Sequence, residues 1–591
     1  MGLARAHAIA LVGVQGHPVE IEADIENGLV TLLLVGLPDT ALREARDRIR
    51  AAIVNSGESW PSRRITVGLS PASLPKRGSG FDLGIALAIL AASEAIPEAS
   101  LEGLVLIGEL GLDGRIRPVP GVLPAAAAAS AAGFSAVVVA TENAAEAALI
   151  PELRVIAAPR LAMLTAWLRV GMPSDDPIVR VIEAGHEAYA GDFPAGPSPD
   201  GSLSPDQRLS PDGGLSPNGV LSSGRGLSPD RGSSSGRGSS SGRGSSSGRG
   251  LSSGWAASAD WGPRDRSGRR EAVKDLADLV GQPVARRAAE ICAAGGHHLM
   301  LLGPPGVGKT MLAERIPTIL PRLDSAAALE VTSIHSVAGT LPPDTPLIVD
   351  PPFCAPHHTA TRAAIVGGGS GVIRPGAASL AHRGCLFLDE APEFGRDVLD
   401  GLRQPLESGE VVIARAGVTA RFPARFTLIL AANPCPCASA RTTGAACSCT
   451  PLAKRRYLAR LSGPLLDRVD AKIEFLPVSR RELLSDRAFA ESSATVAARV
   501  VQARARAAER LADTPWQLNA QVPGSELRRK FAPAAAALAP LERAMDLGRI
   551  SARGADRVIR LSWTLADLAG IDRPRIDEVG YALGLWSGTP L

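Results

Sequence analysis

A glycine-rich loop near the middle of the chain has the residue types that bind phosphate groups. It reads GPPGVGKT and fits the pattern G-x-x-x-x-G-K-[ST], with an apolar strand-like segment before it and a helix-period segment after it. Glycines let backbone N–H groups turn towards a phosphate with no Cβ in the way. The candidate nucleotide-binding residues are Gly303, Gly306, Val307, Gly308, Lys309 and Thr310. We expect Lys309 to reach the β- and γ-phosphates of a nucleoside triphosphate, and the Thr310 hydroxyl to hold Mg²⁺.

Polar side chains follow two later apolar strands. CLFLDEAPEF places Asp389 and Glu390 directly after a strand, where one carboxylate can support Mg²⁺ and the other can polarise the water that attacks a γ-phosphate. RFTLILAAN ends at Asn433, whose amide we expect to orient that water. A helix or turn cap is the alternative role for this asparagine. An acidic pair after a strand is common, but downstream of the glycine loop it favours an ATPase.

Four of the seven cysteines are clustered in the sequence CPCASARTTGAACSC. These are Cys435, Cys437, Cys447 and Cys449. Two C-x-C pairs separated by nine residues can fold back and present four thiolates to one Zn²⁺. A redox-active pair of thiols and a cluster without any ligand are the alternatives. We expect a structural zinc site.

Three further segments hold candidate residues with weaker patterns. GEVVIARAGVTARFPARF alternates on both sides of Ala416 and Gly417 and predicts a hairpin. LSGPLLDRVD places Arg468 after an apolar turn, where an arginine can stabilise charge on the γ-phosphate of a neighbouring subunit. The adjacent His357 and His358 could ligate a metal, but no carboxylate or cysteine stands at a fixed spacing from them. We therefore expect no metal at the histidines.

The size and composition are those of a multidomain protein without a membrane segment. A chain of 591 residues exceeds what one hydrophobic core supports, and 45% hydrophobic with 21% charged residues is typical of globular domains. The formal net charge of +3 gives no general argument for nucleic acid. No apolar run reaches the roughly 18 residues of a membrane helix, and the start is too short and glycine-broken for a signal peptide. We expect a cytoplasmic protein, in which clustered cysteines suggest metal before disulfide.

Composition divides the chain into four regions. Residues 1–170 alternate strand and helix patterns, including the all-apolar helix pattern FDLGIALAILAAS, and predict an α+β domain with mixed strands. Residues 194–270 consist of LSPD- and GRGSSS-type repeats, with ten arginines and six aspartates but almost nothing apolar to bury. This region is predicted to be a disordered spacer, with weak, salt-sensitive contact to nucleic acid as the alternative.

The last two regions form the second half of the protein. Residues 271–480 contain the motifs above and alternate strands with helices, as in a parallel sheet covered on both faces. The segment DLADLVGQPVARRAAEICAAGG is expected to be one helix leading into the strand before the glycine loop. Residues 481–591 are helix-periodic throughout and are expected to form a helical lid on the nucleotide-binding core.

Together, these motifs resemble the magnesium-chelatase-like AAA+ ATPases of the ComM/YifB type. The segments that carry the resemblance include GPPGVGKTMLAER, FCAPHHTATRAAIVGGG, PGAASLAHRGCLFLDEAPEF, FTLILAANPCPC and, in the first half, RITVGLSPASLPKRGSGFDLGIALAIL. The resemblance implies a Lon-protease-like N-terminal domain of the ribosomal S5 domain 2-like fold, an AAA+ core with chelatase-type insertions, and a C-terminal lid. It also implies a homo-hexameric ring that uses ATP and Mg²⁺ as a DNA helicase, promoting branch migration of single-stranded or branched DNA during natural transformation.

The resemblance also implies roles for individual residues. Lys309 and Thr310 become the phosphate and Mg²⁺ ligands, and Asp389 and Glu390 the Walker B pair. The first sensor, the arginine finger and the second sensor of the lid would be Asn433, Arg468 and Arg553. The hairpin corresponds to an insertion that points into the pore of related ring motors, so Arg415 and Arg421 are candidate contacts for DNA phosphates.

The sequence departs from the family pattern in both halves. Lon-type proteolysis needs a serine and a lysine, but Asp82 stands at the serine position and Leu123, Pro124 and Ala125 stand where the lysine is expected, so we expect no proteolysis. In the lid, Trp563 replaces an arginine-containing run, and YALGLWSG lacks the usual arginine. The alternative to a DNA motor is a chelatase-like or chaperone-like ATPase that remodels a protein partner.

Overall fold

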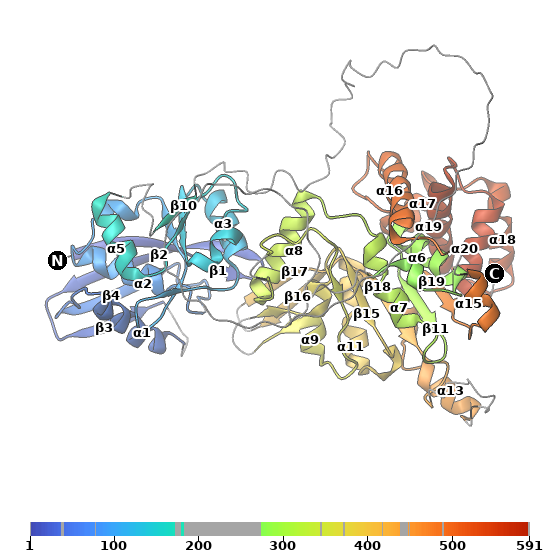
Figure 1. Ribbon diagram of the computed structural model, residues 1–591, viewed down its shortest axis with the longest axis horizontal. Coiled ribbons are helices and arrows are strands. Elements are labelled where there is room, and N and C mark those ends of the chain that lie inside the picture. Colours follow the sequence, from blue (N-terminus) through green and yellow to red (C-terminus); the bar gives the residue numbers. More distant parts are fainter. Residues whose placement is uncertain are drawn as a thin grey trace, which may run out of the picture. The chain divides into compact units, whose positions relative to one another are not determined.

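The structure is a computed structural model of the chain (Figure 1). It describes residues 2–36, 41–76, 78–171, 179–182, 274–342, 345–369, 373–415, 418–437, 447, 449–486 and 490–588. The predicted linker, residues 194–270, lies outside the described residues. None of the helices described has the length and apolar character needed to cross a bilayer.

The N-terminal part is built on an eight-stranded mixed sheet in the order β10-β9-β8-β5-β1-β2-β4-β3. Its strands are β1 Gly2–Val12, β2 Gln15–Glu26, β3 Thr31–Val35, β4 Arg64–Ser70, β5 Leu104–Leu106, β8 Ala136–Val139, β9 Arg154–Ala157 and β10 Arg180–Ile182. The short strands β6 Glu109–Leu110 and β7 Ile116–Arg117 pair separately. β1 and β2 form a long antiparallel hairpin, whereas β1, β5, β8 and β9 run parallel. The predicted mixture of strand directions is confirmed.

Helices cover both faces of this sheet. They are α1 Ala41–Asn55, α2 Asp82–Ala92, α3 Val122–Ala131, α4 Ala144–Ala147 and α5 Leu161–Val170, with 3-10 turns at Glu98–Leu101 and Thr141–Asn143. Side chains alternate along β1, so that Ala8 packs in the cluster containing α2 while Ile9 packs in the cluster containing α3. Every residue of α2 is buried, as its apolar composition predicts.

The C-terminal part is built on a five-stranded, wholly parallel sheet in the order β12-β15-β18-β11-β19. Its strands are β11 Leu299–Leu302, β12 Phe353–Cys354, β15 Cys385–Leu388, β18 Thr427–Ala432 and β19 Ala471–Glu474. Two small antiparallel pairs lie outside it, β13 Gly367–Gly368 with β14 Arg374–Pro375, and β16 Glu410–Arg415 with β17 Val418–Pro423. The apolar runs of β15 and β18 are buried, as expected of strands covered on both faces.

The helices of the C-terminal part alternate with the strands in the core and then follow one another in the lid, as predicted. In the core they are α6 Pro283–Gly295, α7 Lys309–Ala313, α8 Ser325–Ala338, α9 Arg362–Val366, α10 Ala377–Leu380, α11 Arg396–Gly401, α12 Arg403–Ser408, α13 Pro451–Leu458 and α14 Gly463–Leu466. Short 3-10 turns occur at Leu276–Asp278, Ile316–Ile319, Ala391–Glu393 and Asn519–Gln521. The prediction of one helix before β11 is wrong in its first half: α6 begins only at Pro283, because Gly281 has a φ of 80° and proline favours the first helical position.

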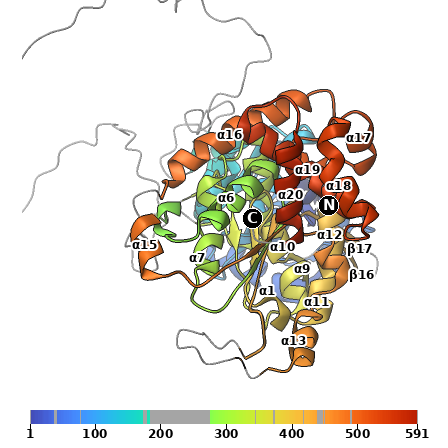
Figure 2. The ribbon, with the colours of Figure 1, turned by 90° about the vertical axis from the view of Figure 1, so that its right-hand side faces the viewer.

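The lid is helical, as predicted, but its segments are divided more finely. It consists of α15 Arg480–Asp486, α16 Ser493–Arg510, α17 Gly524–Arg529, α18 Ala535–Asp546, α19 Ala552–Ala569 and α20 Ile576–Ser587 (Figure 2). The two predicted segments that begin at Arg481 and Ser525 are each two helices. Pro533 lies between α17 and α18, where its missing N–H and fixed φ prevent a continuous helix.

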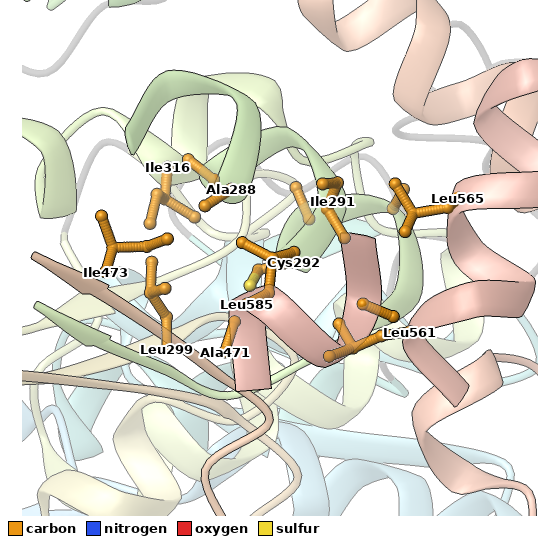
Figure 3. Close-up of a cluster of buried hydrophobic side chains, with 14 of the residues drawn as sticks. Ala288, Ile291, Cys292, Leu299, Ile316, Ala471, Ile473, Leu561, Leu565 and Leu585 are labelled. Atoms are coloured by element: carbon orange, nitrogen blue, oxygen red, sulfur yellow. The ribbon is translucent and has the colours of Figure 1, made fainter. Parts of the chain in front are cut away.

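The lid and the sheet share one hydrophobic core (Figure 3). Cys292 of α6, Leu299 of β11 and Ile473 of β19 lie in the same buried cluster as Leu561 of α19 and Leu585 of α20. Continuous burial of apolar surface across this boundary makes the lid part of the same folded unit as the parallel sheet.

A buried ion pair also joins the lid to the sheet. The Asp470 carboxylate, directly before β19, pairs with the Arg557 guanidinium of α19 and accepts the His298 N–H at 2.9 Å. Burial alone would raise the pKa of Asp470, but the positive charge of Arg557 and the contacts with His297 and His298 together outweigh burial and hold this pKa well below its usual range. The carboxylate is therefore charged and doubly held inside the domain.

We predict that Asp470→Asn strongly destabilises the C-terminal part, because it leaves Arg557 buried without its counter-charge. The unfolding free energy of that transition in urea should fall by about 3–5 kcal/mol. Glu393→Gln, which removes the exposed partner of Arg460, should leave the midpoint nearly unchanged. Since the native pKa of Asp470 is depressed, the stabilisation is present above the unfolded pKa of about 4 and is lost as the pH falls further, so the difference should shrink in acid. Equal effects of the two variants would contradict this prediction.

Candidate functional site

The predicted phosphate loop forms the turn between β11 and α7. Gly306 and Gly308 have φ angles of 80° and 99°, which glycine adopts without strain. A Cβ on Gly303 would lie 2.8 Å from the backbone oxygen of Phe475, so only glycine fits at the start of the loop. Val307 packs against the core beneath the loop. The helix that follows is shorter than predicted and continues as a 3-10 turn.

The Lys309 side chain is buried beneath this loop. Its Nζ donates to the backbone oxygens of Gly303 at 2.7 Å and Pro304 at 2.9 Å, and to Asn433 Oδ1 at 3.1 Å. Burial lowers the pKa of this ammonium group, and the carboxylates of Asp389 and Glu390 act in the opposite direction. The loop therefore holds a desolvated cation ringed by oxygen atoms.

The hydroxyl and carboxylate predicted to hold Mg²⁺ are in direct contact. Thr310 Oγ1 donates to Asp389 Oδ2 at 2.8 Å, and Asp389 Oδ1 accepts the Glu390 N–H at 2.9 Å. Hard oxygen donors of this kind suit Mg²⁺, which keeps several waters and takes few protein ligands. The residues present therefore fit the ion.

Strand register explains why Asn433 meets Lys309. β11 pairs in parallel with β18 so that Leu302 lies opposite Ala432, and the Gly303 N–H donates to the Ala432 oxygen at 3.1 Å. Asn433 directly follows β18, and its buried amide oxygen accepts a hydrogen bond from the Lys309 ammonium. Its side chain thus contacts the lysine of the loop.

Glu390 has an unusual backbone and a partner that sequence reasoning missed. Its φ of 50° is in the left-handed region, which non-glycine residues rarely adopt. Its Oε2 lies 3.4 Å from the Nδ1 of His358, on the segment that follows β12. The histidine pair was considered only as a metal site, because nothing in the local sequence connects it to the acidic pair.

Arg468 and Arg553 belong to a different group of residues. Arg468 pairs with Glu407 of α12, and its side chain is only 14% exposed. Burial lowers the pKa of Arg468, and the nearby charges of Arg403, Arg557 and Arg553 add to this effect. Among the described residues, neither Arg468 nor Arg553 has a hydrogen bond or ion pair to the loop or the acidic pair. The predicted site residues therefore lie in two separate sets. Arg468 and Arg553 form one set, and the loop residues, the acidic pair and Asn433 form the other.

The four clustered cysteines converge in space. Their sulfur atoms all lie within 4.8 Å of one another, and three of the separations are 3.2, 3.4 and 3.5 Å. Four sulfurs around Zn²⁺ at 2.3 Å would be about 3.8 Å apart, so the arrangement fits a tetrahedral site. Burial and the neighbouring thiols raise the pKa of Cys435 to about 12, a shift that a cation at the centre would reverse.

The predicted hairpin is formed by β16 and β17, with its tip at residues 416–417 outside the described part. The two strands pair from Glu410 opposite Pro423 to Arg415 opposite Val418. Arg415 is exposed, whereas Arg421 makes an ion pair with Glu410 at 2.6 Å. The two candidate DNA contacts therefore differ in how much free charge they present.

In the N-terminal part, the position aligned with the Lon serine has a structural role. Asp82 is buried at the start of α2 and pairs with Arg48 of α1 at 3.0 Å. Burial raises the pKa of Asp82 to about 6, although Arg48 opposes the shift. Leu123, Pro124 and Ala125 are buried in α3. Neither position offers a nucleophile or an amine.

A lysine and a serine do occur near Asp82, but each has other partners. The Lys76 ammonium is buried and donates to the backbone oxygens of Pro71 and Leu74, and burial lowers its pKa. The Ser79 hydroxyl donates to Glu109. Among the described residues, no hydrogen bond joins Lys76 to Ser79.

Trp563, the departure noted in the lid, packs inside it. Its indole Nε1–H donates to the Phe531 backbone oxygen at 2.8 Å, and the Arg510 guanidinium lies 4.3 Å from its ring centroid. The tryptophan therefore stabilises the lid interior through packing and a cation–π contact.

Three segments match protein families, and together they cover most of the described chain. Residues 275–483 match the family described as magnesium chelatase, subunit ChlI. Residues 21–143 match the description subunit ChlI of Mg-chelatase, and residues 490–585 match its C-terminal region. The first match corresponds to the parallel-sheet core, and the third corresponds to the lid.

Similar proteins extend the likeness to nearly the whole length. An uncharacterized protein of Mycobacterium tuberculosis is 46% identical over 99% of this chain and 98% of its own length. The protein YifB of Escherichia coli is 36% identical over 96% and 94%, and the competence protein ComM of Haemophilus influenzae is 35% identical over 98% and 97%. With the loop, the acidic pair and the parallel sheet in place, this chain belongs to the magnesium-chelatase-like AAA+ family that includes YifB and ComM.

Proposed function

We propose that the protein is an ATP-hydrolysing ring motor that acts on DNA. The observation that carries the ATPase part is the convergence of Lys309, Thr310, Asp389, Glu390 and Asn433 at the carboxyl edge of one parallel sheet. Nucleotide sites in open α/β sheets lie at this edge. Family membership supports the same activity.

The residues of this set supply the parts that phosphoryl transfer needs. A triphosphate in the loop would take the Lys309 ammonium from the backbone oxygens of Gly303 and Pro304. Thr310 and Asp389 would hold Mg²⁺, whose charge neutralises that of the phosphates. Glu390 would accept a proton from the attacking water as its oxygen bonds to the γ-phosphorus and the bond to ADP breaks.

A ring of subunits would supply an arginine at the γ-phosphate, which the residues around the loop lack. Arg468 and Arg553 form their own group, apart from the loop of the same chain. Charge on the transferred phosphoryl group is commonly stabilised by an arginine supplied from a neighbouring subunit. We therefore propose a homo-hexamer in which Arg468 leaves Glu407 and acts on the adjacent subunit, with Arg553 as the second sensor.

Basic surfaces support DNA as the partner. Arg415 is exposed beside the hairpin tip, and Arg421 is exposed but paired. Near the cysteine cluster, Arg396, Arg456 and Arg460 line an open pocket of about 550 Å³ together with Glu393, which pairs with Arg460. Such surfaces favour sequence-independent binding to a phosphate backbone. Branch migration in recombination or natural transformation is the proposed use, supported by the likeness to a competence protein.

The runner-up function is remodelling of a protein partner. It is favoured by the family's matches to magnesium-chelatase subunits, whose names indicate work on a chelatase complex. Both functions use the same ATPase site, so they differ only in what the ring contacts. DNA is preferred because the exposed hairpin arginine and the pocket arginines lie on surfaces of the same ATPase core.

We propose structural Zn²⁺ for the four cysteines. The cation would hold the chain from Cys435 to Cys449 and so fix the start of α13, which begins directly after it. Redox pairing is less favoured, because all four sulfur atoms, rather than two, lie within 4.8 Å of one another.

Lys309→Ala is expected to lower the ATP turnover rate at least about a hundredfold, because one positive charge at the developing phosphoryl charge is removed. Steady-state phosphate release measures this effect. Lys530→Ala, which changes an exposed lysine of the lid, should hydrolyse ATP like the wild type. Turnover by Lys309→Ala at the wild-type rate would refute the assignment of the site.

Elemental analysis of the purified protein should give about one zinc per chain. Cys437→Ser should lose the metal, whereas Cys354→Ser, which changes a cysteine outside the cluster, should retain it. A zinc content near zero in the wild type, purified without chelators, would exclude the four-thiolate site.

Single-stranded DNA and four-way junctions should stimulate ATP hydrolysis. Arg415→Ala should weaken DNA binding and reduce the slope of log affinity against log salt by about one unit, because one phosphate contact is lost. Arg421→Ala should have a smaller effect, since Glu410 already neutralises that side chain. If the wild type shows neither DNA stimulation nor salt-sensitive binding, the DNA motor is refuted, and protein remodelling becomes the function to test.

A further inference from the structure

We propose that His358 is a positioning residue that orients the Glu390 carboxylate for activation of the attacking water. The inference rests on the proposed ATP hydrolysis and deepens it, because it assigns a residue that controls the base. It also gives a role to the histidine pair, which neither the phosphate loop nor the cysteine cluster uses.

Parallel strand pairing brings the histidine to the acidic pair. β12 lies beside β15, with Phe353 opposite Cys385 and Cys354 opposite Leu386. The chain beyond each strand therefore leaves the sheet at the same edge. As a result His358 Nδ1 lies 3.4 Å from Glu390 Oε2, although the residues are far apart in sequence.

The His358 ring is itself held in place. Its centroid lies 4.1 Å from that of the His357 ring, with the planes 33° apart. His357 is fixed in turn, since its Nδ1 lies 2.9 Å from the Thr359 hydroxyl. His358 is 33% exposed at its side chain, so packing against a neighbouring ring limits its motion more than burial does.

Glu390 depends on this contact for its orientation. Its left-handed backbone, with a φ of 50°, costs of order 1 kcal/mol and sends the side chain in a direction that a helix or strand would not. The Glu390 backbone N–H donates to Asp389, and among the described residues His358 alone pairs with the Glu390 carboxylate. Without the imidazole, the carboxylate would sample several rotamers.

An imidazole on one carboxylate oxygen leaves the other oxygen free for catalysis. In the tautomer that carries a hydrogen on Nδ1, His358 faces Oε2 of Glu390 at 3.4 Å, close enough for a small rotation of either side chain to form a hydrogen bond. The second oxygen can then accept the proton of the water whose oxygen attacks the γ-phosphorus, as the bond to the ADP leaving group breaks. His358 touches neither water nor phosphate in this scheme, so its loss should affect the rate of hydrolysis more than ATP binding.

The test compares two replacements of His358 in the full-length protein, with and without DNA. The amide nitrogen of asparagine occupies the place of Nδ1, and that of glutamine occupies the place of Nε2. His358→Ala and His358→Gln should each lower kcat about tenfold or more while KM for ATP changes less than about threefold. His358→Asn should recover most of the lost rate. His357→Phe, which keeps the stacked ring but loses its nitrogens, should remain close to wild type.

A second measurement separates orientation of Glu390 from a loss of folding. Combined with Glu390→Gln, His358→Ala should cause no further fall in turnover, because the group it orients is already gone. An unchanged or increased kcat in His358→Ala, an equal fall in His358→Asn, or a full additional fall in the Glu390→Gln background would each overturn the proposal. If wild type and Lys309→Ala show the same turnover, the proposed ATPase function fails first, and that outcome is distinguishable from all of these.

Discussion

The parallel register of three strands is the constraint on which the site depends. β11 pairs with β18, and β18 pairs with β15, so the residues after all three strands leave the sheet at one edge. Parallel pairing therefore places three groups at the same edge although they are far apart in sequence: the loop at Gly303, the amide of Asn433 and the carboxylates after Leu388. A slip of one residue in β18 would turn Asn433 away from Lys309 and bury a polar group in the sheet.

A second constraint concerns the arginines that do not reach the loop. Asp470 lies two residues after Arg468, and its partner Arg557 lies one helical turn after Arg553. One buried ion pair therefore fixes the chain next to both arginines and ties the lid to the sheet. The shared apolar core around Leu299 and Leu561 acts in the same direction. Motion of the lid would thus carry both arginines with it.

Local patterns predicted much of this arrangement from the sequence. The glycine loop, the acidic pair after β15, the cysteine cluster and the hairpin each consist of residues close together in the chain, so spacing alone indicated them. The contact of His358 with Glu390 was not predictable in this way, since it depends on β12 lying beside β15. The Asp470–Arg557 pair joins a strand to a lid helix and leaves no local signal. The start of α6 was missed although Gly281 and Pro283 mark it, because the apolar periodicity continues through both.

In the proposed function, the loop and the acidic pair bind a triphosphate, and a neighbouring copy of the chain completes the site. The most direct measurement is a structure of the assembled protein with Mg²⁺ and a slowly hydrolysed ATP analogue. The account predicts that the Lys309 ammonium leaves the oxygens of Gly303 and Pro304 for the phosphate oxygens, and that Arg468 of an adjacent subunit approaches the γ-phosphate. A triphosphate bound elsewhere, with the Lys309 contacts unchanged and Arg468 still on Glu407, would contradict it.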